Sequence, residues 1–133
     1  MQPLPTRSFA PQASAGTPVD EEQSASPSGR ASAVTVASKA VAAFCRPTLP
    51  PEVWLSALEP YLTADAAAAY VTVLPGRVPC HRVAGAGSPI DGDGFTQTIR
   101  VPTDAGACLV LAQRPDGYAG WRVARIVLPG RGR

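Results

Sequence analysis

The spacing of hydrophobic positions changes once along the chain, from helical in the first half to alternating in the second. Apolar residues recur three and four positions apart from about 32 to 46, which predicts a helix capped by Ser32 and stopped by Pro47. A second helix is expected from Pro50 to Pro60, because proline suits a first helical turn. A third is expected from Thr63 to Val71, with the Thr63 side chain as its N-cap.

Four extended runs follow, at residues 78–86, 95–101, 107–113 and 121–128. The run 95–101 alternates apolar and polar residues, whereas 107–113 is apolar on both faces and is expected to be a central strand. Short links between runs favour antiparallel neighbours. The pattern predicts an α+β fold of helices packed on an antiparallel sheet. The expected core comprises Phe44, Trp54, Leu58, Ile99, Leu109, Leu111 and Val123.

The chain of 133 residues has room for one domain of ordinary size. Residues 1–32 are rich in proline, serine and alanine and hold few large apolar side chains, which predicts a disordered tail. Residues 33–129 are expected to form a single α+β domain, and residues 130–133 a flexible C-terminus.

Charge and cysteine content narrow the function classes. Twelve basic and ten acidic residues leave a net charge of +2, so no direct nucleic-acid binding is expected. No run approaches the roughly 18 apolar residues of a membrane span, and the N-terminus has no apolar signal region. As written, the chain is therefore expected in the cytoplasm. Cys45, Cys80 and Cys108 contain no metal-binding spacing; one disulfide with a free thiol is possible, and three buried reduced thiols are the simpler reading.

Candidate chemistry is sparse. His81 is the one imidazole, and on an extended segment its neighbour Cys80 would point to the opposite face. The glycine-rich stretch 85–94 departs from both the dinucleotide and the calcium-loop patterns. Arg122 and Arg125 lie three apart on a strand and would face opposite sides unless a bulge intervenes. We predict no catalytic residue, no metal and no cofactor.

Four short sequence motifs in residues 33–129 carry a family resemblance. A tryptophan-bearing helix ends in proline-tyrosine-leucine (Trp54–Leu62), and a proline phrase enters the sheet (Gly76–Pro79). A turn of Val-Pro-Thr-Asp-Ala-Gly (Val101–Gly106) and a Gly-Trp-Arg-Val strand (Gly120–Val123) follow. Together they resemble the nuclear-transport-factor-2-like superfamily, and within it small actinobacterial proteins similar to conjugation and secretion scaffold domains.

This resemblance implies a cone-shaped fold whose antiparallel sheet is strongly bent. It implies a non-catalytic interaction or assembly domain, an accessory of conjugative DNA-transfer or cell-envelope machinery, whose partner is another protein or a second copy. Such relatives carry a transmembrane helix before the domain, which the first 33 residues here do not contain. Either this chain lacks that anchor, or its assigned start lies inside a longer reading frame and the protein is envelope-associated.

The superfamily also contains enzymes, and these imply an alternative. In that reading the cone holds a small molecule, as in isomerase- and dehydratase-like members. The cavity walls would then be Trp54, Tyr61, Tyr70 and His81. A deep pocket containing a carboxylate or His81 would favour the enzyme, whereas a filled cone would favour the scaffold.

Overall fold

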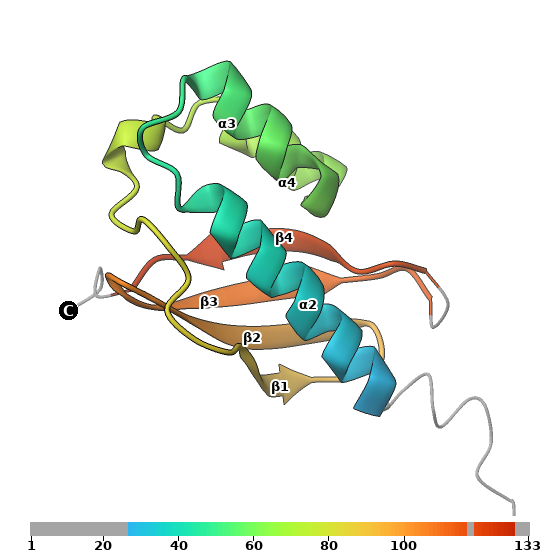
Figure 1. Cartoon of the computed structure of the whole chain (residues 1–133). Helices are drawn as coiled ribbons and strands as arrows, with labels where there is room; N and C mark the ends of the chain where they lie inside the picture. Colours follow the sequence, from blue (N-terminus) through green and yellow to red (C-terminus); the bar gives the residue numbers. More distant parts are fainter. Residues whose placement is uncertain (1–26, 117–118, 130–133) are drawn as a thin grey trace, which may run out of the picture.

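Helices cover one side of a four-stranded antiparallel sheet (Figure 1). The computed structural model describes residues 27–116 and 119–129. The helical elements are α2 (Pro27–Phe44), α3 (Pro51–Leu58), the 3-10 turn η1 (Glu59–Tyr61), α4 (Ala64–Tyr70) and the 3-10 turn η2 (Pro75–Arg77). The strands are β1 (Ser88–Gly92), β2 (Thr96–Thr103), β3 (Gly106–Gln113) and β4 (Arg122–Val127), in that order across the sheet.

The three predicted helices are confirmed, with one change of boundary. Helix α2 begins at Pro27, inside the stretch expected to be tail, and proline is well tolerated in a first turn. The prediction that Ser32 caps this helix is therefore wrong, because Ser32 lies inside it. In α4 the Thr63 hydroxyl accepts a hydrogen bond from the Ala66 N–H at 3.1 Å, which satisfies an otherwise unpaired donor. The remaining tail predictions, for residues 1–26 and 130–133, lie outside the described residues.

The sheet differs from the prediction at its first strand. Residues 78–86 form no regular strand; only Val83 makes an isolated bridge, to Thr103, and the first strand lies later, at Ser88–Gly92. The backbone N–H groups of His81 and Arg82 bond instead to the side chain of Asp104. Among the described residues, the segment makes only two backbone bonds to this part of the sheet, from the Ala84 N–H to the Pro102 carbonyl and from the Asp104 N–H to the Arg82 carbonyl, and the Asp104 side chain supplies the other acceptor.

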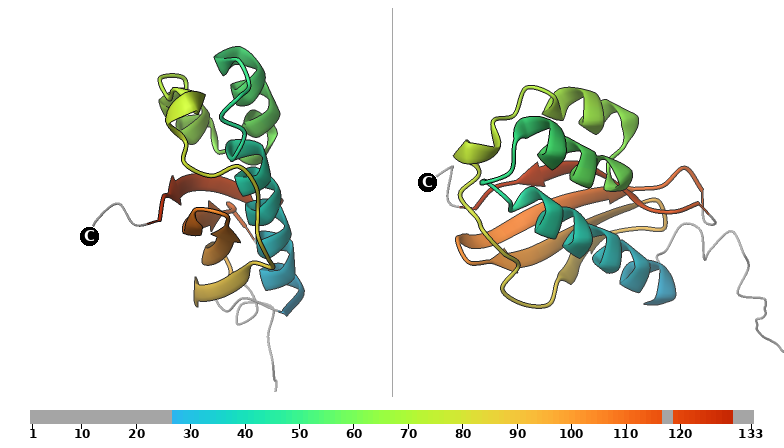
Figure 2. Two further views of the ribbon diagram at one scale, coloured as in Figure 1. Left: turned by 60° about the vertical axis from the view of Figure 1, so that its left-hand side comes forward. Right: turned by 45° about the horizontal axis from the view of Figure 1, so that its top comes forward.

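The sheet is not strongly curled, so the strong bend expected of a cone is not found (Figure 2). Strands β2 and β3 pair without interruption from Thr96–Gln113 to Thr103–Gly106. Register shifts occur only in the outer pairs, between Pro89 and Asp91 and between Leu111 and Ala112. Strong curvature requires bulges or glycine kinks along the sheet, and the central pair has none.

The core lies between α2 and the sheet, which α2 crosses on one face (Figures 1 and 2). Three fully buried alanines, Ala33, Ala37 and Ala40, let the helix approach the strands closely. The expected core residues that are buried are Phe44, Trp54, Leu58, Ile99 and Val123.

Two expected core residues are misplaced. Leu109 is 38% exposed and Leu111 is only half-buried, whereas Cys108, Val110 and Ala112 between and beside them are fully buried. Side chains alternate between the faces of a strand, and α2 covers only the face that carries the second set. Strand β3 is therefore central in the sheet, as predicted, but helices cover only one of its two apolar faces.

The outer edge of β4 is covered by the segment after α3. Leu62 bridges to Val123, and the Thr63 N–H donates to the Val123 carbonyl at 2.9 Å. Further along, the Ile126 N–H donates to the Tyr70 hydroxyl at 3.0 Å. These contacts satisfy backbone groups that an open edge would expose.

Candidate functional site

The four residues expected to line one cavity are dispersed. Trp54 is buried in the core, where its indole Nε1–H donates to the Phe44 carbonyl at 2.9 Å. Tyr61 is half-buried and packs against the core. The side chain of His81 is 65% exposed. Of the four, Tyr70 alone lines the groove beside α4 that is described below.

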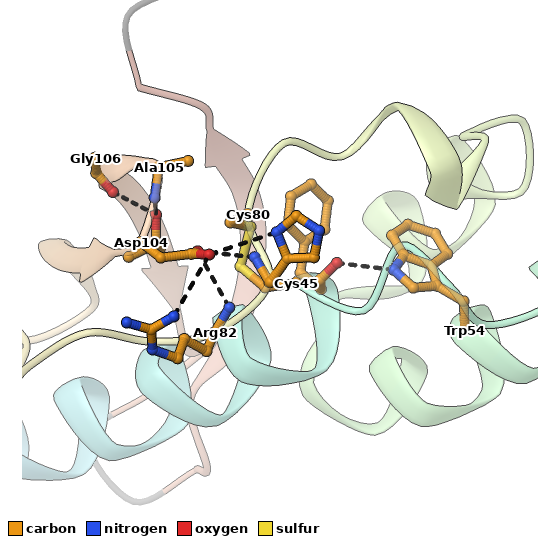
Figure 3. Close-up of a disulfide and its surroundings, with 10 residues drawn as sticks. Cys45, Trp54, Cys80, Arg82, Asp104, Ala105 and Gly106 are labelled. Carbon is orange, nitrogen blue, oxygen red and sulfur yellow. Dashed lines mark hydrogen bonds and ion pairs between the residues drawn. A yellow bond between two sulfur atoms is a disulfide. The ribbon is translucent and has the colours of Figure 1, made fainter.

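His81 belongs to a surface cluster around Asp104. Figure 3 shows Asp104 and Arg82 of this cluster. One carboxylate oxygen of Asp104 accepts the backbone N–H groups of His81 at 2.8 Å and Arg82 at 3.2 Å. The other oxygen lies 3.4 Å from His81 Nδ1 and 3.8 Å from Arg82 Nη1. The hydrogen bond from the His81 N–H is the main reason that the pKa of Asp104 is lowered, since it stabilises the carboxylate. The cluster holds an irregular segment against a turn.

A disulfide joins Cys45, just after α2, to Cys80, in the segment that enters the sheet (Figure 3). Both cysteines are fully buried, and their Cα atoms are 4.9 Å apart. The expectation of three reduced thiols is therefore wrong for this pair, since proximity in space does not follow from a separation of 35 residues. Cys108 is free and buried, and burial raises the pKa of its thiol to about 11.

An apolar groove of about 450 Å³ lies between α4, the segment after it and the end of β4. Among the described residues that line it there is no carboxylate, and His81 does not take part. Its lining residues are Phe44, Tyr70, Thr72, Val73, Leu74, Arg77, Val78, Ile126 and Leu128. The groove is an apolar surface with one cation.

Tyr70 supplies the groove's neutral hydroxyl. Burial raises the pKa of Tyr70, against the smaller opposing effects of the Ile126 N–H bond and the positive charge of Arg125. The phenol is therefore protonated near neutral pH. Its oxygen accepts from Ile126, and its proton has no acceptor among the described residues, so it can donate to a bound molecule.

The face of the sheet that α2 leaves uncovered, here called the open face, carries a second set of features. Residues directly opposite each other in antiparallel strands project to the same side. Leu109 on β3 is opposite Arg100 on β2 and Val127 on β4. One step along β3, Leu111 is opposite Arg125. An apolar row thus runs along the middle of the open face with an arginine on either side.

A bulge brings a third arginine to this face. The register between β3 and β4 shifts after Leu111, so that Gln113 is opposite Arg122 while Leu111 is opposite Arg125. Gln113 and Leu111 are two apart and share a face, so Arg122 and Arg125 share it also. The sequence pattern left these two arginines on opposite faces unless a bulge intervened, and a bulge does intervene. Both are exposed.

The open face ends in a hollow of about 400 Å³. Arg122 and Gln113 line it, and so does Phe95, which is half-buried. Arg114 also lines it, but that guanidinium is already engaged: its Nε donates to the Gly94 carbonyl at 2.8 Å, and it lies 4.4 Å from the centre of the Trp121 ring. The hollow therefore combines an apolar wall with the cation of Arg122.

The described residues contain neither a candidate metal site nor a candidate membrane span. No group of three or more histidine, cysteine, aspartate or glutamate side chains there is placed to hold a metal ion. No helix in residues 27–116 and 119–129 is both long enough and apolar enough to cross a membrane.

Comparison with known proteins gives no match to a family model, to a curated protein or to a solved structure. The function is therefore argued from the geometry of this chain.

Proposed function

We propose that this domain is a non-catalytic interaction or assembly module that binds a partner protein on its open face. The observation that carries the proposal is the exposed pair Leu109 and Val127, which are 38% and 43% exposed and lie directly opposite each other on β3 and β4. Single exposed apolar residues are normal on any protein. An apolar row in register, flanked by cations, is typical of a contact surface.

The positions of the ionisable groups support a non-catalytic role. His81 contacts Asp104 in the surface cluster, away from the groove. The ionisable side chains that line the groove are Arg77 and the protonated phenol of Tyr70. General acid–base chemistry needs a titratable pair in reach of one reacting atom. Neither the groove nor the open face brings such a pair together among the described residues.

We also propose that the module works outside a reducing compartment, in the cell envelope. The buried Cys45–Cys80 disulfide supports this setting, because structural disulfides form and persist under oxidising conditions. The resemblance to nuclear-transport-factor-2-like scaffold domains would make conjugative DNA transfer or envelope assembly the process that it serves.

Site-specific photo-crosslinking in cells tests the proposed surface. A photoreactive residue at position 109 or 127 should form an adduct with one defined protein, whereas the same residue at Val53, which is exposed on α3, should not. Leu109→Asp should abolish the adduct formed from position 127. Equal labelling from position 53, or an adduct insensitive to Leu109→Asp, would contradict the proposal.

A second function is favoured by the groove. The groove suits a small carboxylate with an alkyl chain. Its apolar lining would contact the alkyl chain, and the exposed Arg77 guanidinium and the Tyr70 hydroxyl would donate hydrogen bonds to the carboxylate. If the groove is a ligand site, dodecanoate should bind at least about tenfold more tightly than dodecanol, and Arg77→Gln should remove that difference. Equal binding of the two compounds to the unmodified protein would exclude this function.

A further inference from the structure

We infer that the open face binds an amphipathic helix of a partner protein, with carboxylates on both flanks of the helix's apolar stripe. The inference rests on the proposed function and specifies the chemistry of the partner. It follows from three properties of the face: the spacing of its strands, the sign of its charges and the hollow at its end.

The spacing of the strands suits a helix lying along β3. Neighbouring strands are about 4.8 Å apart, so β2 and β4 stand about 10 Å from each other, close to the diameter of an α-helix. Leu109 and Leu111 on β3 would contact the apolar stripe. Arg100 on β2 and Arg125 on β4 would then meet side chains on opposite flanks of the same helix.

The charges of the face call for a partner with carboxylates. Arg100, Arg122 and Arg125 are exposed, and none forms an ion pair with a carboxylate of the described residues. The acid that the register places on this face is Asp91, opposite Thr98. Guanidinium groups bind carboxylates with two parallel hydrogen bonds, which fixes the register of the partner as well as its charge.

The same charges argue against other occupants. Two copies of the chain packed by this face would bring six arginines together against two aspartates, a repulsive arrangement. A nucleic-acid backbone would satisfy the arginines but leave the row of Leu109, Leu111 and Val127 without apolar contact. An acidic amphipathic helix satisfies both.

The hollow gives the helix an end point. Arg122, Gln113 and Thr96 line it at the edge where the open face ends, and Phe95 forms part of its wall. A volume of about 400 Å³ accommodates one large apolar side chain. We expect the partner helix to place a leucine or aromatic residue there, with a carboxylate close by for Arg122.

The experiment uses the full chain and a designed helical peptide of about 15 residues, long enough to cover the face. The peptide carries leucines at helical spacing with glutamates on both flanks, and a matched peptide has glutamines at those positions. Fluorescence anisotropy should show the glutamate peptide binding at least about tenfold more tightly than the glutamine peptide, with a difference that shrinks at high salt.

Variants locate the site. The double variant Arg122→Gln/Arg125→Gln should weaken binding of the glutamate peptide about tenfold or more and leave binding of the glutamine peptide unchanged. Arg46→Gln, an exposed arginine beyond the end of α2, is the matched control and should change neither. Leu109→Asp should weaken the binding of both peptides.

The outcomes distinguish two hypotheses, that the open face is an interaction surface and that its partner is an acidic helix. If both peptides bind equally and only Leu109→Asp weakens them, the open face is an interaction surface but the acidic partner is wrong. If neither peptide binds, both are overturned. Tight binding to phosphatidylglycerol vesicles or to duplex DNA without binding of the glutamate peptide would replace the helix with a membrane or a nucleic acid. Concentration-dependent dimerisation abolished by Leu109→Asp would replace it with a second copy.

Discussion

At the scale of single residues, several polar side chains stand in for missing backbone partners. Asp104 accepts the N–H groups of His81 and Arg82, and the Tyr70 hydroxyl accepts that of Ile126. Trp54 does the reverse and donates to the carbonyl at the end of α2. Buried or strand-edge backbone groups without such partners would be costly, so these side chains make irregular segments stable.

Asp104 makes the stability of the fold dependent on pH at the acid end. Because the pKa of Asp104 in the folded protein lies below its ordinary value of 3.8, the carboxylate stabilises the fold fully above pH 3.8. That contribution is lost as the pH falls through the lowered pKa. Asp104→Asn should therefore lower the Tm at pH 7 and have a much smaller effect near pH 3, measured by circular dichroism.

The control for this effect is Asp91→Asn, which removes an exposed carboxylate that makes no hydrogen bond to the described residues. It should leave the Tm at pH 7 unchanged. A Tm difference between wild type and Asp104→Asn that stays constant from pH 7 to pH 3 would show that the carboxylate charge is not what holds the 81–82 segment.

The two faces of the central strands should differ sharply in their tolerance of truncation. Ile99→Ala empties a fully buried site beneath α2 and should cost about 2–5 kcal/mol of unfolding free energy. Leu109→Ala removes a side chain that is 38% exposed on the open face and should cost less than about 1 kcal/mol. Urea unfolding measures both. Similar losses at the two sites would mean that something covers the open face in the free protein.

At the scale of elements, the spacing of apolar residues was enough to predict the helices and the last three strands. Thr63 correctly marked the start of α4, whereas Ser32 did not mark the start of α2. The first strand was missed because residues 78–86 are extended yet bond to a side chain from a distant turn, which local sequence does not reveal. The bulge between Leu111 and Ala112 was left open by the sequence for a similar reason, since it depends on how β4 registers against β3. The arginine cluster of the open face depends on that bulge and could not be predicted from spacing alone.

The turn between β1 and β2 depends on one glycine. Gly92 has φ of +134°, and a Cβ there would lie 2.2 Å from the Thr96 carbonyl oxygen and 2.7 Å from the Gln97 Cα. Gly92→Ala should therefore cost at least about 1–3 kcal/mol of unfolding free energy in urea. Gly76→Ala, where nothing lies within 4 Å, is the control and should change stability by less than about 0.5 kcal/mol. Equal effects would mean that the turn readily adopts another conformation.

At the scale of the whole molecule, one helix layer covers one face of the sheet, and the disulfide joins the end of α2 to the segment that leads into the sheet. The chain length indicated one domain of ordinary size, and the run 107–113 indicated a strand that is apolar on both faces. Neither says how many helices are available to cover the sheet. Here α2 crosses a single face, so Leu109 on the other face of β3 stays exposed. The groove and the open face arise from this arrangement and not from any local motif.

The disulfide should be a major source of stability for so small a fold. It closes a loop between residues 35 apart, and the chain-entropy model assigns such a cross-link about 4 kcal/mol of unfolding free energy. Cys45→Ala/Cys80→Ala should lose about that amount in urea unfolding, and reduction of the unmodified protein should lose a similar amount. Cys108→Ala, which alters a free thiol, should respond to reductant as the unmodified protein does.

Thiol counting provides the decisive check on that cross-link. In the native protein Cys108 should react slowly with alkylating reagents, because it is buried and its pKa is raised to about 11, which leaves little thiolate at pH 8. Denaturation without reductant should expose one reactive thiol, and denaturation with reductant should expose all three cysteines of the chain. Three reactive thiols before reduction would show that the disulfide is not formed, and the main support for an oxidising compartment would be lost. One thiol, with the expected loss of stability on reduction, would confirm the disulfide and support the proposal that the protein works in an oxidising compartment.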